Sequence, residues 1–199
     1  MNWNSITDLG DTAVTVPMAM ALATLLMASQ GTRSALAWLS LFGAGAFFVL
    51  SMQIAYAGWD IGVEQFDFTG ISGHSFGATS VFSVAAYYIG SRFSAAAAFV
   101  AGCLGFCLGI LVGISRIILG AHSPSEVIIG CALGGAIALA SNATLGYRRR
   151  TGFVTGLFAF AIGAIVCCSQ EHRAPSHQLA VRVALYLSGR SAPFARGTH

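Results

Sequence analysis

The sequence contains no lysine, and all ten of its basic residues are arginines. Charged residues make up only 9% of the chain, whereas soluble domains carry roughly 25%. This scarcity excludes an ordinary soluble domain. The hydrophobic fraction of 56% and a mean hydropathy of +0.75 indicate an integral membrane protein instead. The net charge is only +3 and no long basic run occurs, so we expect the lipid bilayer, and no nucleic acid, as a partner.

The five cysteines do not form a recognisable framework. Their spacing matches neither a zinc site nor a set of disulfides. Cys103, Cys107 and Cys131 fall within apolar segments, where cysteine usually serves as a small core residue. The sequence therefore gives no indication of a bound metal or of any other cofactor.

Six apolar segments approach the roughly 20 residues that a helix needs to cross a bilayer. They span residues 12–29, 34–57, 75–90, 93–114, 127–147 and 151–169. The sequence therefore predicts an all-α fold, a polytopic membrane bundle of about six transmembrane helices. We expect residues 1–170 to form this transmembrane domain and residues 171–199 to form an extracytoplasmic tail.

The arginines predict the orientation of the bundle. Arg33, Arg92 and residues 148–150 lie in three loops that share one side of the predicted bundle. Short cytoplasmic loops carry an excess of basic residues, so this side is predicted to be cytoplasmic. The opposite side carries five acidic residues and a single loop arginine, Arg116. We expect an inner-membrane protein whose acidic side faces the periplasm.

The tail contains one regular pattern. Between residues 176 and 188, Leu179, Val183 and Leu187 recur on one helical stripe, with polar residues elsewhere. Such a stripe is typical of a short amphipathic helix that lies in the membrane interface.

Two polar segments interrupt the apolar chain on the predicted periplasmic side. We call residues 69–75 the first polar segment and residues 115–126 the second. The first contains Ser72, Gly73 and His74, and the second contains Arg116 and His122. Ionisable groups beside hydrocarbon are costly and are usually functional. We expect the two segments to meet in one phosphate site.

The residue types suit phosphate chemistry. The guanidinium of Arg116 presents a planar fork of donors that matches phosphate. Gly73 permits close backbone approach at the start of a predicted helix, where N–H groups bind anions. His74 and His122 are the histidines of the predicted spans and their loops. Imidazole serves as nucleophile or as proton donor near neutral pH, so either histidine suits either role.

Glu126 has two interpretations. Ser123, Pro124 and Glu126 fit the N-cap, N1 and N3 positions of a helix with a capping box. The carboxylate also lies four residues after His122 and would orient its imidazole. The two roles do not exclude each other, because a carboxylate has two oxygens.

Together these residues resemble a known family. Ser115-Arg116, five residues, His122, three residues and Glu126 are similar to the third signature motif of the type 2 phosphatidic acid phosphatase superfamily, which includes the vanadium haloperoxidases. Ser72-Gly73-His74 resembles its second motif, with Ile71 where proline is usual. The resemblance covers the second to fifth predicted spans.

The resemblance implies a role for each matching residue. His122 would be the nucleophile that forms a phosphohistidine, oriented by Glu126 in place of the usual aspartate. His74 would protonate the leaving oxygen. The phosphoryl oxygens would be bound by Arg116 and by a set of small residues, Ser72, Gly73 and Ser115. The resemblance implies no metal and no other cofactor, and the substrate would be a membrane lipid phosphate or pyrophosphate.

The chain departs from the family at its first motif, a lysine followed after six residues by Arg-Pro. The corresponding stretch, residues 58–68, has no basic residue. Within this stretch, Trp59 suits a membrane interface and Gln65 suits a loop. Two further hypotheses follow: a catalytically weakened or inactive member that binds a lipid or a partner, and a small transporter. The transporter is disfavoured because no ionisable residue lies in the middle of a span.

Overall fold

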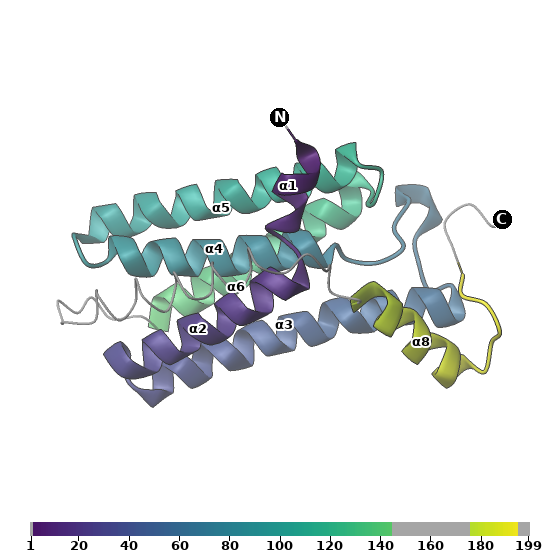
Figure 1. Ribbon diagram of the computed structural model, residues 1–199, viewed down its shortest axis with the longest axis horizontal. Coiled ribbons are helices and arrows are strands. Elements are labelled where there is room, and N and C mark those ends of the chain that lie inside the picture. The colour runs from purple at the N-terminus through teal and green to yellow at the C-terminus, as the bar shows by residue number, and fades with distance from the viewer. Residues whose placement is uncertain (1, 145–175, 195–199) are drawn as a thin grey trace.

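The computed structural model describes residues 2–144 and 176–194, and within these ranges every regular element is helical except for one isolated bridge between Val63 and Phe68. Figure 1 shows the helices in chain order. They are α1 (Trp3–Asp8), α2 (Thr12–Gln30), α3 (Thr32–Trp59), a 3₁₀ turn (Glu64–Phe66), α4 (Gly73–Gly90), α5 (Ala95–Ile118), α6 (Pro124–Thr144) and α8 (Ser176–Ser188).

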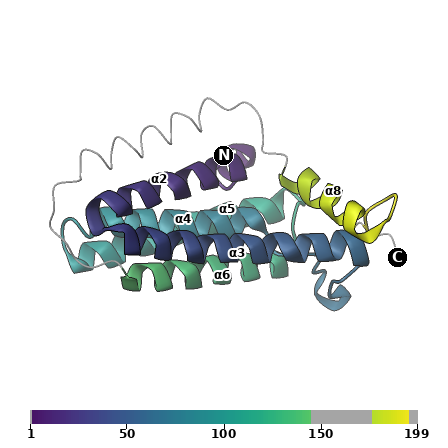
Figure 2. The same cartoon turned by 90° about the horizontal axis from the view of Figure 1, so that it is seen from below.

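Helix α4 is the centre of the bundle. It contacts α2, α3, α5 and α6, and every residue from 75 to 85 is buried. The long helices run side by side in both views of the ribbon (Figures 1 and 2). Two of its buried hydroxyls bond within the helix, because Thr79 and Ser80 donate to backbone carbonyls one turn earlier, at 2.6 and 2.8 Å. The buried Ser83 hydroxyl has no such partner among the described residues.

Glycines bring two helices close to α4. A Cβ atom at Gly109 of α5 would lie 2.5 Å from the Cα of Thr79. A Cβ atom at Gly134 of α6 would overlap the hydroxyl of Thr79 and lie 2.7 Å from the carbonyl oxygen of Phe76. Small residues at helix crossings allow such close packing in membrane bundles. The close spacing of α5 and α6 from α4 therefore requires glycine at these two positions.

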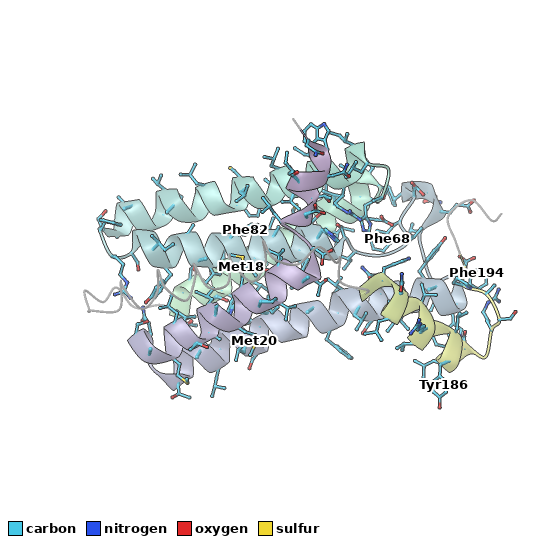
Figure 3. All side chains as sticks on the ribbon, viewed as in Figure 1. Met18, Met20, Phe68, Phe82, Tyr186 and Phe194 are labelled. Carbon is cyan, nitrogen blue, oxygen red and sulfur yellow. The ribbon has the colours of Figure 1, made fainter. Side chains whose placement is uncertain are left out.

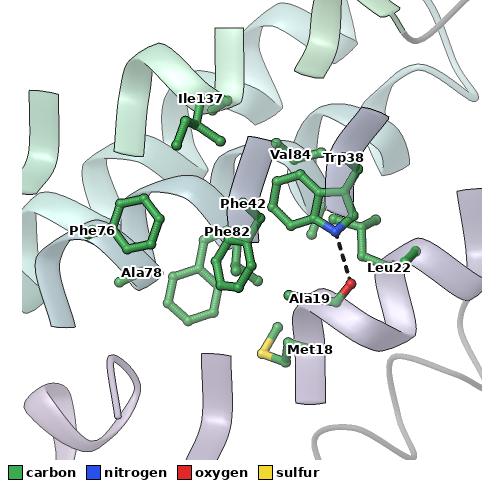
Figure 4. Close-up of a cluster of buried hydrophobic side chains, with 14 of the residues drawn as sticks. Met18, Ala19, Leu22, Trp38, Phe42, Phe76, Ala78, Phe82, Val84 and Ile137 are labelled. Carbon is green, nitrogen blue, oxygen red and sulfur yellow. Dashed lines mark hydrogen bonds between the residues drawn. The ribbon is translucent and has the colours of Figure 1, made fainter. Parts of the chain in front are cut away.

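Aromatic residues join α2 and α3 to α4. The indole nitrogen of Trp38, which is fully buried, donates to the carbonyl of Ala19 at 2.9 Å (Figure 4). The rings of Trp38 and Phe42 lie 5.3 Å apart, and those of Phe42 and Phe76 lie 5.6 Å apart. One continuous core thus links three helices.

The predicted spans agree with the observed helices to within a few residues, as far as the chain is described. Four of the helices in residues 2–144 and 176–194 are long and apolar enough to cross a membrane, namely α2, α3, α5 and α6. The all-helical membrane bundle is thus confirmed, but not the number of six spans. Helix α4 is not among the four, and the span predicted at residues 151–169 lies outside the described residues.

The end of the bundle opposite α1 contains the α2–α3 and α4–α5 turns. Arg92 donates to the hydroxyl of Tyr88, which in turn donates to Ser29 at 2.8 Å. Arg33 lies in the first turn of α3 at the same end. The prediction that Arg33 and Arg92 share one side is therefore confirmed. Residues 148–150 lie outside the described residues.

The amphipathic tail helix predicted from the sequence is observed as α8. Its buried residues Ala180 and Ala184 face α3, where a Cβ atom at Gly58 would lie 3.3 Å from the carbonyl oxygen of Ala184. Beyond the helix, the Phe194 amide donates to the Ala57 carbonyl at 3.0 Å. The exposed side of α8 carries Leu179, Tyr186 and Leu187. Figure 3 shows Tyr186 pointing away from the bundle.

Candidate active site

The two polar segments meet at the end of the bundle where α4 and α6 begin and α5 ends. The Ser72 amide donates to the Glu126 carbonyl oxygen at 3.2 Å. The amide and the hydroxyl of Thr69 both donate to Glu126 Oε1, each at 2.6 Å. The expected meeting of the segments is therefore observed, and Thr69 contributes a contact that sequence reasoning did not identify.

The turn between α5 and α6 fixes Arg116 relative to His122. Helix α5 ends at Ile118, and Gly120 adopts a left-handed conformation with φ of 66°. Glycine tolerates this conformation, which commonly ends a helix. The Arg116 carbonyl then accepts the amides of Ala121 and His122, at 2.9 and 3.3 Å. The chain thus turns back over the end of α5. These backbone hydrogen bonds fix the backbone positions from which the Arg116 and His122 side chains extend.

His122 is oriented by a buried carboxylate. Its Nδ1 lies 2.7 Å from Glu126 Oε2, and Glu126 is fully buried. A carboxylate oxygen accepts, so Nδ1 carries the proton and Nε2 of the neutral ring carries the lone pair. The contact therefore leaves the lone pair of Nε2 unused by Glu126.

Glu126 also caps helix α6. Its Oε2 accepts the Ser123 amide at 3.1 Å, while the Ser123 hydroxyl faces the Glu126 amide at 3.5 Å. This is the reciprocal arrangement of a capping box. One carboxylate thus contacts the imidazole, the cap of α6 and Thr69 together, a geometry compatible with both interpretations of Glu126.

His74 lies in the first turn of α4, and its side chain is 20% exposed. Its Nε2 is 3.8 Å from Oδ2 of Asp11, whose side chain is 10% exposed. Oδ1 of Asp11 accepts the Ala13 amide at 2.8 Å and so caps α2. In the sequence, Asp11 is distinguishable only as one of the acidic residues on the predicted periplasmic side.

Arg116 contacts the short helix α1. Its Nη1 donates to the hydroxyl of Thr7 at 3.1 Å, and Thr7 is buried. The two residues lie 109 positions apart. They meet because α1 packs on α5. No sequence pattern predicts this packing, because α1 has only six residues.

A cavity of about 770 Å³ opens beside these groups. Four predicted site residues line it, namely Gly73, His74, Arg116 and His122. Its other walls are largely apolar and come from α2, α3 and α8, including Phe42, Ala46, Val49, Leu50, Leu179 and Val181. The arrangement places two histidines and an arginine in the wall of a largely apolar cavity.

This geometry agrees with the comparisons to known proteins. The profile of the PAP2 superfamily matches residues 59–150. An "Uncharacterized 22.5 kDa protein in cps region" of Klebsiella pneumoniae is 31% identical over 204 residues, which cover 98% of this chain and 96% of the relative. The chain belongs to the PAP2 superfamily. No solved structure matches it.

Two of the residues that the PAP2 resemblance assigned to phosphate binding do not line the cavity. The Ser72 hydroxyl faces the Ser75 amide at 3.4 Å and caps α4. The Ser115 hydroxyl donates to the Val112 carbonyl at 2.6 Å within α5. Both serines are fully buried. Each stabilises a helix end that carries a lining residue, His74 in one case and Arg116 in the other.

The stretch that lacks the first PAP2 motif forms the loop between α3 and α4. Trp59 and Gln65 are exposed there and do not line the cavity. His177 of α8 lines it instead. In residues 2–144 and 176–194, no three acidic, histidine or cysteine side chains are grouped as metal ligands would be.

Proposed function

We propose that this PAP2 protein is a membrane-embedded, metal-independent phosphatase of lipid phosphates or pyrophosphates that acts through a phosphohistidine. The observation that carries the proposal is the 2.7 Å contact between His122 and the buried Glu126, at a cavity also lined by His74 and Arg116. A nucleophile, an orienting acid, a proton donor and a cation are thus grouped around one space.

In the first step, the Nε2 lone pair of His122 attacks phosphorus and forms the P–N bond. The bond from phosphorus to the leaving oxygen breaks, and its electron pair stays on that oxygen. His74 gives the oxygen a proton, so the lipid leaves as an alcohol, or as a phosphate from a pyrophosphate substrate. Glu126 stabilises the positive charge that develops on the His122 ring.

In the second step, water attacks the phosphohistidine. Neutral His74 takes a proton from the attacking water, and the P–N electron pair returns to Nε2 of His122. Inorganic phosphate is released, and both histidines recover their starting protonation states. The same group thus serves first as acid and then as base.

The phosphoryl oxygens would be bound by Arg116 and by the start of α4. The guanidinium matches phosphate, and Thr7 holds Nη1 in place at 3.1 Å. Gly73 and His74 line the cavity at the helix N-terminus, where backbone amides and the helix dipole favour an anion.

The apolar walls of the cavity suit a lipid. Its headgroup would reach the histidines while an acyl or isoprenoid chain lies along α2 and α3. Candidate substrates are phosphatidic acid, phosphatidylglycerol phosphate, isoprenyl pyrophosphates and phosphorylated lipid A. We place the site on the periplasmic face of the inner membrane, because Arg33 and Arg92 occupy the opposite end of the bundle.

The test is phosphate release from this panel of lipids in detergent. We expect release by the wild type and its loss in His122→Ala, with Glu64→Gln as a matched control on an exposed loop carboxyl. A ³²P-labelled substrate should label the wild type with an alkali-stable, acid-labile bond. Lipid binding by the wild type without phosphate release would favour the inactive, lipid-binding alternative.

A further inference from the structure

The N-terminal elbow, which we define as residues 7–11, contacts the site from outside the part of the chain that the PAP2 profile matches. That profile begins at residue 59. The elbow joins α1 to α2 and contributes two polar contacts: Thr7 to Arg116 at 3.1 Å and Asp11 to His74 at 3.8 Å. Figure 1 shows α1 crossing the end of α5, directly before α2 begins.

The elbow is packed closely against the site. A Cβ atom at Gly10 would lie 3.0 Å from both the Cβ and the carbonyl oxygen of His74, and 2.5 Å from a methyl group of Val112. Only a residue without a side chain fits there. The position of Asp11 relative to the His74 ring is therefore set by backbone packing.

We propose that Asp11 is a positioning residue for His74, which it holds as the protonated imidazole that gives its proton to the leaving oxygen. This inference rests on the proposed phosphatase function and deepens it. It assigns the elbow to the reaction and explains why the two histidines have different roles.

The two histidines have carboxylates of different geometry. Glu126 contacts Nδ1 of His122 at 2.7 Å, so one N–H is used and Nε2 is left with its lone pair. Asp11 lies 3.8 Å from Nε2 of His74, beyond the usual hydrogen-bond distance. Its charge attracts the protonated ring across this gap. The first pair makes a nucleophile and the second makes an acid.

Both groups are partly withdrawn from water, which strengthens the attraction. The side chains of His74 and Asp11 are 20% and 10% exposed. When His74 gives its proton to the leaving oxygen, the ring becomes neutral beside the carboxylate. The ring then recovers a proton from the attacking water of the second step, so the Asp11 carboxylate ends the cycle as it began.

A purely structural role for Asp11 is separable from this one. Oδ1 of Asp11 caps α2 through the Ala13 amide at 2.8 Å. Asparagine is an N-cap as good as aspartate. Asp11→Asn therefore removes the charge that faces His74 and keeps the cap of α2.

The experiment compares two leaving groups in the full-length protein. An alkyl lipid phosphate needs a protonated leaving oxygen, whereas p-nitrophenyl phosphate leaves readily as the phenolate. We expect Asp11→Asn to lower kcat for the lipid by about tenfold or more and to change kcat for the aryl ester little. His74→Ala should show the same selectivity, and Glu64→Gln should affect neither substrate. An equal loss on both substrates, or no loss on either, would overturn the proposal.

A second measurement does not depend on turnover. Diethyl pyrocarbonate modifies unprotonated imidazole, and mass spectrometry resolves the modified histidines. We expect His74 to react about fivefold faster in Asp11→Asn, the order of the attraction between unit charges at this separation. His122 should react at an unchanged rate. If the wild type hydrolyses neither substrate, the phosphatase function fails, and this measurement still decides whether Asp11 controls the His74 proton. An unchanged rate at His74 would overturn that control.

Discussion

Thr69 donates both its backbone amide and its hydroxyl to Glu126 Oε1, each at 2.6 Å. This pair of bonds occupies one carboxylate oxygen and turns the other, Oε2, toward His122 and the Ser123 amide. The first polar segment therefore orients the histidine of the second segment through a single buried side chain.

The first prediction concerns Thr69. Thr69→Val keeps the amide donor and the shape of the side chain but removes the hydroxyl donor. We expect stability to fall by about 1 kcal/mol and kcat to fall several-fold with KM unchanged, because Glu126 is held less firmly. Steady-state kinetics and thermal unfolding in detergent measure both. Thr24→Val is the matched control, since Thr24 is exposed and its hydroxyl donates to the Met20 carbonyl within α2. Equal effects of the two variants would contradict the role of Thr69.

The second prediction concerns Glu126. Glu126→Gln removes the charge beside His122 and places an amide nitrogen among the donors of Thr69 and Ser123. We expect turnover to fall about tenfold or more and the stability to fall by roughly 1–3 kcal/mol, because the carboxylate serves both the imidazole and the cap. Kinetics per folded molecule and unfolding in detergent separate the two effects. Normal turnover in a destabilised protein would leave only the capping role.

The third prediction concerns α8, which contributes to the cavity wall. His177 lines the cavity, whereas Arg182 is exposed and does not line it, and Arg173 lies outside the described residues. We expect His177→Ala to raise KM for a lipid phosphate several-fold with little change in kcat. Arg182→Ala serves as the matched control on the same helix and should leave KM unchanged.

Truncation after Gln170 extends this test. If α8 contributes to binding, the truncated protein should lose at least as much apparent affinity as His177→Ala. Unchanged kinetics after truncation would show that Arg116 and the backbone amides are sufficient, and α8 would then serve only as an anchor in the membrane interface.

The fourth prediction concerns orientation. In a cysteine-free background, Glu64→Cys should react with a membrane-impermeant thiol reagent in intact spheroplasts, and Phe93→Cys should react only after lysis. Both residues are exposed, and they lie beyond opposite ends of α4, Glu64 in the α3–α4 connection and Phe93 in the α4–α5 turn. Gly62 is a poorer position for labelling, because a Cβ atom there would lie 2.6 Å from the Phe68 carbonyl oxygen. The reverse pattern would place the site on the cytoplasmic face.

The parts of the site that the sequence predicted are those held by local backbone geometry. Arg116 lies in the last turn of α5, His122 in the connection that follows, and Glu126 in the first turn of α6. Gly120 and the capping box determine how that connection folds. Helix α8 was predicted for a similar reason, because its apolar stripe is a local pattern. Hydrophobic periodicity and helix-capping residues are sufficient to predict features of this kind from the sequence.

The contacts of the N-terminal elbow were not predicted, and the reason is physical. Thr7 and Asp11 reach the site only because a six-residue helix packs on the end of α5. Such a helix is too short to show a periodic pattern, and its partners are distant in the chain. The phosphate-binding roles assigned to Ser72 and Ser115 stay predictions. Their hydroxyls bond within their own helix ends, a detail that a motif does not contain.

The glycines that bring α5 and α6 against α4 have a consequence for the chemistry. His74 lies in the first turn of α4, whereas Arg116 lies in the last turn of α5 and His122 precedes α6. The gap between the proposed proton donor and the proposed nucleophile is therefore a gap between helices. Gly109 and Gly134, which lie deeper in the bundle, keep that gap narrow because they place no side chain between the helices. Adding one methyl group at either position would push a helix away from α4 and so increase the distance between the site residues that these helices carry.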